Sequence, residues 1–338
     1  MPCVLLFCLG NCFYKLNILD YSNISLKVMR IYHSPVMVQE VLESINFKSL
    51  GVLVDCTLGS GGHSEAILEY AKSIGKKIKI LALDLDYEGI EIAKKRLNNN
   101  LDSIIIKQGN FSNISNIVKE SGIDKVEAVL FDLGVSSLHL EKPIRGFSFR
   151  QDAELDMRFD INQTDSASNV INQESEETLK NIIRDFGEEP QANAIARSIV
   201  KNRPINSTLK LADIIVRAKK SYKYKSIHPA TQTFQAIRMY VNNELDNINS
   251  GIKQAISLLK KSGRIITISY HSIEDRLVKK LLLEESRECI CPTNILECVC
   301  NHSASLKLMF KKVIKPSLEE IRQNRRSRSA KLRVAEKI

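Results

Sequence analysis

Several short segments carry residues suited to binding a nucleotide-like ligand. The run from Asp55 to His63 contains glycines at 59, 61 and 62, and the absence of side chains there lets a ligand approach the backbone closely. A dinucleotide-binding fingerprint needs a further glycine at position 64, which is Ser64, so the match to a pyrophosphate-binding turn is incomplete. A tight turn without any ligand is the alternative interpretation.

Acidic and aromatic residues follow at positions where an adenosine could bind. Asp84 lies roughly 20 residues past the glycines, where a carboxylate can accept hydrogen bonds from both ribose hydroxyls. Asp86 is better explained as a helix N-cap. Phe111, just after Gly109 and Asn110, could place an aromatic face against adenine, although a core position is the alternative.

The segment that begins at Asp132 could join a methyl donor to its acceptor. It reads Asp132-Leu133-Gly134-Val135-Ser136-Ser137, a carboxylate followed by a flexible turn. The exocyclic amine of cytosine or adenine is a poor nucleophile because its lone pair is delocalised into the ring, and a carboxylate or carbonyl acceptor can draw the amine out of plane. Alignment, desolvation and proton removal then carry the reaction, which requires no metal.

The elements around these segments alternate between strands and helices. Short runs rich in Val, Ile and Leu predict strands that are buried on both faces of a parallel sheet. The predicted strands are Val52 to Cys56, Lys79 to Asp84, Ser103 to Lys107 and Val126 to Asp132, with helices Ser64 to Ile74 and Gly89 to Leu97 between them. All the segments above therefore follow strands, at the carboxyl edge where open α/β sheets bind ligands.

After Asp132 the alternation stops, and helical patterns predict an inserted domain at 138–233. The sheet pattern resumes at 234–338, so that two segments, 29–137 and 234–338, form one core. The predicted elements are helices Glu176 to Phe186, Gln191 to Lys201, Leu209 to Lys219, Phe234 to Lys260 and Ile273 to Glu284, with strands Arg264 to Ser269, Leu306 to Ile314 and Ala330 to Ala335. A sheet of about seven strands fits a class I methyltransferase, an α/β Rossmann-like fold, better than a classical dinucleotide fold.

The composition of the chain indicates which compartment and which kind of partner to expect. The chain has 338 residues and a net charge of +10, which suits a polyanion such as nucleic acid but also fits an ordinary basic enzyme. The eight cysteines do not resemble a secreted disulfide framework, and the apolar run Val4 to Leu9 is too short to span a bilayer and makes a poor signal peptide. We expect a cytoplasmic protein without membrane association. Residues 1–28 are interpreted as an extension that precedes Met29, which a misplaced start codon would explain.

From about His33 to the C-terminus the chain closely resembles the RsmH/MraW-type 16S rRNA (cytosine-N4)-methyltransferases. No single motif is specific, but the set together is. The matching segments are His33 to Met37, Gly59 to Ser64, Asp132 to Ser137, Arg145 to Phe149, Leu155 to Arg158, Gly187 to Glu189, His228 to Thr231, Tyr270 to Arg276 and Arg328 to Arg333.

The resemblance implies a class I fold with an inserted helical domain, S-adenosylmethionine (SAM) as methyl donor, and methylation of N4 of a decoding-centre cytidine in the small ribosomal subunit. The family's SAM contacts fall on Gly61, Gly62, His63, Asp84, Phe111 and Asp132, and then on His139, where the family has glutamine. This departure puts the His139 contact in doubt. Phe159, Phe186 and Tyr270 stand where the family often has Met, Tyr and Phe, and Arg325 where proline is usual.

Several residues are candidates for contact with RNA, because an amine on the Watson-Crick edge can be methylated only in an unpaired base. Phe147, Phe149 and Tyr270 could stack on such a base, although core packing is the commoner role. Nearby Arg145, Arg150 and Arg158 suit phosphate binding, as do Arg322, Arg325, Arg326, Arg328, Lys331 and Arg333 in the basic tail. Asp156 and His271 could help Asp132 to hold the amine or receive its proton, but the sequence does not identify a general base.

Four further cysteines form two Cys-x-Cys pairs, Cys289 with Cys291 and Cys298 with Cys300, followed by His302. Such thiols could hold one zinc ion, but ordinary zinc knuckles space their cysteines more widely. We therefore treat a zinc site as the less favoured interpretation.

Two other functions are compatible with parts of the sequence. A nicotinamide-dependent oxidoreductase is permitted by the glycine turn but disfavoured by Ser64 and the basic tail. A ribosome-assembly factor could keep the fold without turnover. The sequence leaves open whether free rRNA or an assembled subunit is the substrate, and whether the protein forms a homodimer.

Overall fold

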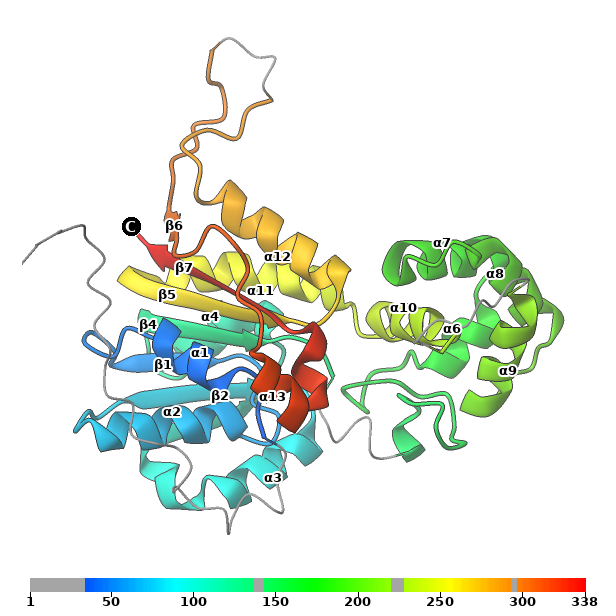
Figure 1. Cartoon of the computed structure of the whole chain (residues 1–338), viewed down its shortest axis with the longest axis horizontal. Coiled ribbons are helices and arrows are strands. Elements are labelled where there is room, and N and C mark those ends of the chain that lie inside the picture. The colour runs from blue at the N-terminus through cyan, green and yellow to red at the C-terminus, as the bar shows by residue number, and fades with distance from the viewer. Residues whose placement is uncertain (1–33, 136–142, 220–227, 293–296) are drawn as a thin grey trace, which may run out of the picture.

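A twisted sheet with strand order β3-β2-β1-β4-β5-β7-β6 forms the centre of the larger of two units in the computed structural model (Figure 1). The structure describes residues 34–135, 143–219, 228–292 and 297–338. The proposed extension at 1–28 and the candidate residue His139 lie outside these ranges.

Seven strands make up the sheet, as expected of the class I fold. The first five are parallel, and β7 inserts antiparallel between β5 and β6. Their bounds are β1 (Val52–Asp55), β2 (Lys79–Asp84), β3 (Ile104–Gln108), β4 (Val126–Asp132), β5 (Leu259–Ser269), β6 (Leu306–Leu308) and β7 (Lys331–Lys337). The strand count and the arrangement confirm the predicted fold class.

Helices cover both faces of this sheet because alternate strand residues point to opposite sides. Leu53 packs in one core with α1 (Val38–Ser44), α2 (Gly62–Ser73) and α3 (Tyr87–Arg96). The adjacent Val54 packs in a second core with α4 (Ile114–Glu120), α11 (Glu244–Leu258) and α12 (Ser272–Glu284). Both side chains are fully buried, as the continuous apolar runs predict.

The inserted segment forms a separate helical unit beside the sheet (Figure 1, green). It contains α6 (Ala167–Gln173), α7 (Glu176–Gly187), α8 (Ala192–Lys201), α9 (Thr208–Ala218) and α10 (Thr231–Val241) around a third apolar core. Serines cap three of these helices: Ser166, Ser175 and Ser207 each accept a hydrogen bond from a backbone N–H in the first turn.

The predicted helix from Phe234 to Lys260 is wrong in one respect, because the chain breaks into α10 and α11 at Asn242 and Asn243. Asn243 has a φ of 49°, a left-handed conformation that asparagine tolerates better than most residues. Phe234 packs in the core of the helical unit, whereas Ile248 packs against the sheet. The helical spacing of apolar residues continues through Asn242 and Asn243, so the sequence pattern does not reveal the break. This packing supports a boundary between the two units near Asn243, later than residue 233.

The other differences lie at strand ends. Leu259 and Lys260, predicted as helix, begin β5 instead. The predicted strand from Leu306 to Ile314 ends at Leu308, and Ile314 returns only as an isolated bridge to Leu332. Short 3-10 helices lie in the sheet unit at Asn98–Ser103, Phe111–Asn113 and Arg325–Ser329, together with α13 (Leu318–Gln323), and another at Pro143–Arg145 begins the helical unit.

Candidate functional site

A cavity of about 440 Å³ opens at the carboxyl ends of the parallel strands, where the sequence predicts ligand binding. This volume lies within the range of small-molecule sites. The lining residues important for its chemistry are Pro35, Thr57, Gly59, Gly62, His63, Asp84, Phe111, Asp132, Phe159, Arg238, Tyr270, His271, Arg325, Arg326 and Arg328.

The glycine turn forms one wall, and its backbone requires glycine. Gly59 and Gly61 have φ values of 51° and 82°, in the left-handed region that favours this residue. A Cβ atom on Gly61 would lie 3.0 Å from the side chain of Leu97, and one on Gly62 would lie 3.0 Å from the ring of Pro35. The turn therefore has little room for any side chain at these two positions.

Asp84 supports the same turn from the end of β2. Its Oδ2 accepts a 2.6 Å hydrogen bond from the backbone N–H of Gly59, and its Oδ1 accepts one of 2.9 Å from Asp86. Both bonds fix the orientation of a carboxylate that lines the cavity. Asp86 caps α3 by accepting from the N–H of Glu88 at 3.2 Å, which confirms its predicted role.

Asp132, at the end of β4, lies at the centre of a polar group deep in the cavity. Its Oδ1 accepts a 2.7 Å hydrogen bond from the hydroxyl of Tyr270, and its backbone N–H donates to Oγ1 of Thr57 at 2.7 Å. Its Oδ2 lies 3.6 Å from Nδ1 of His63. Burial raises the pKa of Asp132 above its usual range, although His63 and the Tyr270 hydroxyl favour the charged form.

His63 faces Asp132 in a fixed orientation. Its Nε2 lies 2.8 Å from the carbonyl oxygen of Val36, and a carbonyl can only accept, so Nε2 carries a proton. Nδ1 is left facing the carboxylate of Asp132.

A second charged cluster adjoins the cavity around Arg238. Its guanidinium binds Glu244 through two hydrogen bonds of 2.7 and 2.9 Å and lies 3.9 Å from Glu274. His271 caps α12 through a 3.4 Å bond from the N–H of Glu274 to Nδ1, and its Nε2 lies 2.8 Å from Oε1 of the same residue. Burial opposes ionisation of Glu274, but His271 and Arg238 hold its pKa below the usual value.

These contacts define what His271 can do. The 2.8 Å separation from Glu274 is short, but the atoms are not aligned for a hydrogen bond. Both ring nitrogens nevertheless face groups of α12, so His271 packs against the start of this helix and helps to position Glu274. Arg238 offsets one of the two carboxylate charges and binds both carboxylate oxygens of Glu244, so these oxygens are already used by an ion pair.

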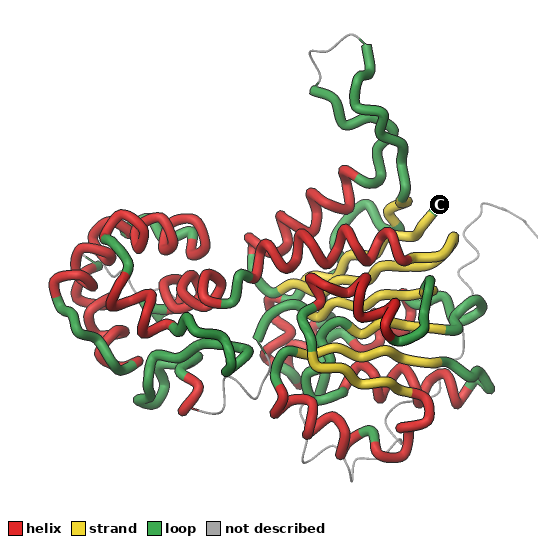
Figure 2. The backbone as a smooth tube through the Cα atoms, turned by 180° about the vertical axis from the view of Figure 1, so that it is seen from behind, coloured by secondary structure: helices red, strands yellow, loops and turns green. Residues whose placement is uncertain are grey.

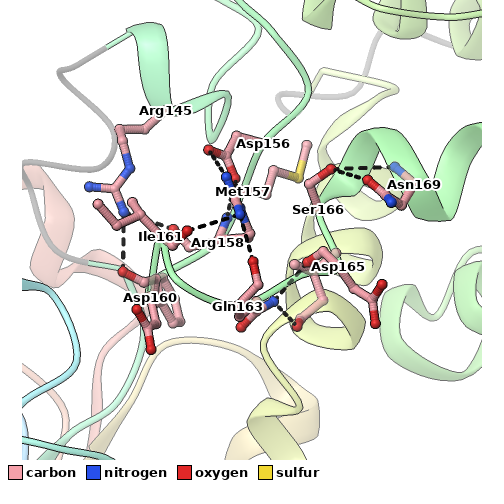
Figure 3. Close-up of polar contacts among 12 residues, drawn as sticks. Arg145, Asp156, Met157, Arg158, Asp160, Ile161, Gln163, Asp165, Ser166 and Asn169 are labelled. Atoms are coloured by element: carbon pink, nitrogen blue, oxygen red, sulfur yellow. Dashed lines mark hydrogen bonds and ion pairs between the residues drawn. The ribbon is translucent and has the colours of Figure 1, made fainter.

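The arginines near the start of the helical unit contact the protein rather than the cavity (Figure 3). Arg158 pairs with Asp156 at 2.6 Å and donates to the carbonyl oxygen of Gln163 at 2.6 Å. Arg145 donates to the carbonyl oxygen of Arg158 at 2.8 Å and reaches Asp86 of the sheet unit at 3.4 Å. The structure thus places Asp156 and Arg158 in a folded loop, and Arg145 as a link between the two units.

The aromatic candidates divide between the core and the cavity. Phe147 is buried and stacks on Phe159 with ring centroids 5.5 Å apart, and Phe149 packs against Phe234. Phe159 and Tyr270 instead line the cavity. Phe111 also lines it, with its ring edge toward Phe131.

The basic tail splits into three parts, of which the first is Arg322, 3.9 Å from Glu319 and outside the cavity. Arg325, Arg326 and Arg328 line the cavity. Lys331 and Arg333 point to Asp275, at 3.2 and 2.7 Å, and bury part of their charge against α12.

The two ends of the described chain meet over the cavity. The N–H of Met37 donates to Glu320 of α13 at 2.7 Å, and the side-chain amide of Asn324 donates to the carbonyl oxygen of Ser34 at 3.3 Å. Pro35, which packs on Gly62, is thereby held in place from the C-terminal side.

Sequence reasoning did not single out Thr57, Arg238, Glu244 or Glu274. Thr57 and Glu274 lie inside segments that were noted only for their neighbours. Arg238 and Glu244 gave a detectable signal: each is a charged residue on an otherwise apolar helix face, which indicates a buried ion pair.

Comparisons with known proteins agree with this geometry. The model of the MraW methylase family matches residues 30–338. The protein named ribosomal RNA small subunit methyltransferase H from Dehalococcoides mccartyi is 45% identical over 306 residues, which cover 90% of this chain and 86% of that protein. The proteins of the same name from Carboxydothermus hydrogenoformans and Clostridium botulinum are 45% and 44% identical over 313 residues, covering 92% of this chain and 99% and 100% of theirs.

Within the described ranges, every helix is too short or too polar to cross a membrane.

Proposed function

The chain belongs to the MraW methylase family, and from this premise we propose that it transfers a methyl group from SAM to N4 of a decoding-centre cytidine in 16S rRNA of the small ribosomal subunit. SAM is the donor that this class of fold uses. The names of the relatives support small-subunit rRNA as the substrate. The choice of N4 rests on the chemistry of the site and on the resemblance of the motifs.

The cavity has the groups that SAM requires. The turn lines the cavity at Gly59 and Gly62, and the open space at the Cα of Gly59 admits a ligand close to the backbone. Asp84 offers acceptors for ribose hydroxyls, and Phe111 offers an apolar wall for adenine. When bound, SAM supplies an electrophilic methyl group on sulfonium, so the protein need only orient, desolvate and deprotonate the acceptor. His63 is a further candidate for contact with SAM, because it lines the cavity and lies beside Asp132. His139 is retained only as a candidate from the resemblance.

The observation that carries the proposal is the setting of Asp132. Its carboxylate lines the cavity between the glycine turn and the arginines of the tail, and Tyr270 and His63 fix its orientation. A carboxylate in this position can accept a hydrogen bond from a cytosine amine and draw its lone pair out of the ring. Its raised pKa also suits it to receive the proton that the amine loses.

The arginines at the mouth of the cavity suit the RNA. We assign Arg325, Arg326 and Arg328 to phosphate contacts, because they lie together on the cavity wall. The loop at residues 145–163 is held by its own side chains, which contact the protein rather than the base. These side chains are Arg145, Phe147, Phe149 and Arg158. Asp156 and His271 are accordingly positioning residues in this proposal.

The two alternative functions differ in binding and in turnover. A nicotinamide-dependent oxidoreductase would bind NAD in this cavity, whereas an assembly factor would bind SAM and the subunit without methyl transfer. Purified protein would be incubated with radiolabelled SAM and small subunits from cells that lack the enzyme. The labelled nucleosides would then be identified by mass spectrometry.

Label on N4 of cytidine is the expected result, and it should disappear in the Asp132→Ala variant. SAM binding without transfer to subunits or to free rRNA would favour the assembly factor. Failure to bind SAM would overturn the assignment of the cavity. Label on another atom would overturn only the N4 specificity.

A further inference from the structure

A long excursion between α12 and β6 carries a cluster of cysteines that methyl transfer does not use. It projects from the sheet unit away from the helical unit (Figures 1 and 2). Its base is closed where Ser305 donates from its N–H to the carbonyl oxygen of Glu285 at 2.8 Å and from its hydroxyl to the Glu285 carboxylate at 2.6 Å. We call the described residues 285–292 and 297–305 the finger.

The described residues of the finger bury little apolar surface. The larger apolar side chains among them, Ile290 and Val299, are 46% and 69% exposed. A segment that buries so little apolar surface needs another source of order to offset its conformational entropy. Disulfides and structural metal ions are the usual sources in such small elements.

Four thiols converge within this segment. The sulfur of Cys289 lies 3.5 Å from that of Cys298 and 3.7 Å from that of Cys300, and the last two sulfurs are 3.5 Å apart. With Cys291, all four sulfurs lie within 4.8 Å of one another. Four thiolates bound tetrahedrally at about 2.3 Å from one zinc ion would be about 3.8 Å apart. The observed spacing matches such a site, whereas a disulfide would bring two sulfurs to about 2.0 Å.

The local backbone also suits bound thiolates. The N–H of Cys291 points to the sulfur of Cys289, and the N–H of Val299 to the sulfur of Cys291, each at 3.4 Å. Such N–H groups stabilise the negative charge that builds up on a four-thiolate site. His302, which follows the second pair, instead contacts the carbonyl oxygen of Glu284 at 3.0 Å, so it is held away from the sulfurs.

We propose that Cys289, Cys291, Cys298 and Cys300 bind one zinc ion in a closed, structural site that orders the finger. Binding replaces the four thiol protons, which are released to solvent, and leaves no open coordination position. None of the lining residues of the cofactor cavity belongs to the finger. The ion therefore acts on the finger alone, and methyl transfer chemistry does not depend on it.

The first experiment measures the metal content of the full-length protein by mass spectrometry after purification without added metal. One zinc per chain is expected, and Cys298→Ser should lose most of it. Val299→Ala is the matched control, because it changes an exposed residue between Cys298 and Cys300 and keeps all four thiols. Both variants should bind SAM as the parent does, which shows that they are folded.

A second readout follows the finger directly. Removal of zinc by a chelator, or the Cys298→Ser substitution, should increase hydrogen exchange in residues 285–305 and leave the sheet unit unchanged. Cobalt substitution should give the intense thiolate-to-cobalt absorption of a tetrahedral site. Iron in place of zinc, zinc that persists in Cys298→Ser, or a native protein with four reactive thiols or disulfides at these positions would each overturn the proposal.

Discussion

The hydroxyl of Tyr270 donates a 2.7 Å hydrogen bond to the carboxylate of Asp132, across the carboxyl ends of β5 and β4. Burial raises the pKa of both groups, and the bond favours the charged form of Asp132 while keeping the proton on Tyr270. The hydroxyl of Tyr270 therefore adjusts the ionisation of the carboxylate that lines the cavity.

Replacement of Tyr270 by phenylalanine should therefore move the acid limb of the pH-rate profile. Without the hydroxyl, the pKa of Asp132 rises further, so the carboxylate is lost at a higher pH and activity falls earlier on acidification. The rate near neutrality should drop roughly tenfold, as expected from the loss of a hydrogen bond to a charged group. The profile would be measured for kcat with small subunits. Tyr240→Phe, in the helical unit, is the control, and an unshifted acid limb in Tyr270→Phe would contradict the coupling.

Asp275 should contribute stability that depends on pH. Burial opposes its ionisation, but Arg333 and Lys331 hold the pKa of Asp275 below its usual value. A lowered pKa in the folded state gives stability that is present above the unfolded pKa of about 4 and is lost as the pH falls through the folded value. Asp275→Asn should cost about 1 kcal/mol at neutral pH, in the range of partly exposed ion pairs.

Urea unfolding of the parent and Asp275→Asn would test this at neutral and acidic pH. The difference in the free energy of unfolding between the two proteins should shrink on acidification. The exposed Asp246→Asn should show no comparable difference at either pH. If Asp275→Asn lowers the free energy of unfolding by the same amount at both pH values, packing and not charge accounts for its effect.

Arg145 should couple the two units. Its guanidinium joins the carbonyl oxygen of Arg158 to the carboxylate of Asp86, and a lysine cannot make both contacts with the same geometry. We expect Arg145→Lys to lower methyl transfer to subunits about tenfold, the equivalent of roughly 1.4 kcal/mol, with little change in SAM affinity. Steady-state kinetics and SAM titration would measure both quantities. Arg184→Lys, whose ion pair with Asp185 is exposed, should leave both unchanged, and an equal loss in the two variants would argue against a specific link.

Arg325 should contribute to RNA affinity through charge. If it contacts a phosphate, Arg325→Ala should weaken binding to small subunits and reduce the slope of log affinity against log salt by about one. Filter binding at several salt concentrations would give the slope. Arg322 lies near in sequence but lies 3.9 Å from Glu319 and does not line the cavity, so Arg322→Ala is the matched control. The same slope for the parent and Arg325→Ala would remove Arg325 from the interface.

The sequence predicts local elements well where charged residues end apolar runs. The bounds of β2 and β4 agree with prediction because Asp84 and Asp132 end buried runs, and the same residues identify the edge that binds ligands. The break at Asn243 was missed because helical periodicity continues through it. Contacts between residues far apart in the sequence were also missed: Arg145 with Asp86 and Lys331 with Asp275 pair across the fold, where composition indicated only phosphate binding.

Phe147 and Phe159 show the same limit within a single loop. Both are aromatic and close in the sequence, yet one is buried and the other lines the cavity. Periodicity cannot decide between them because the loop has no regular repeat. The difference comes from tertiary packing, because Phe147 joins the core that includes Phe234 and Ile237 of α10, whereas Phe159 packs at the edge of that core.

The contacts between Met37 and Glu320 and between Ser34 and Asn324 make the cavity depend on both ends of the described chain. The same is true of β7, which fills the sheet between β5 and β6 with residues 331–337. Because synthesis runs from the N-terminus, residues 331–337 emerge after every other strand of the sheet, and the earlier segments can fold first. A nascent chain that still lacks β7 therefore has an incomplete sheet and an incomplete cavity wall.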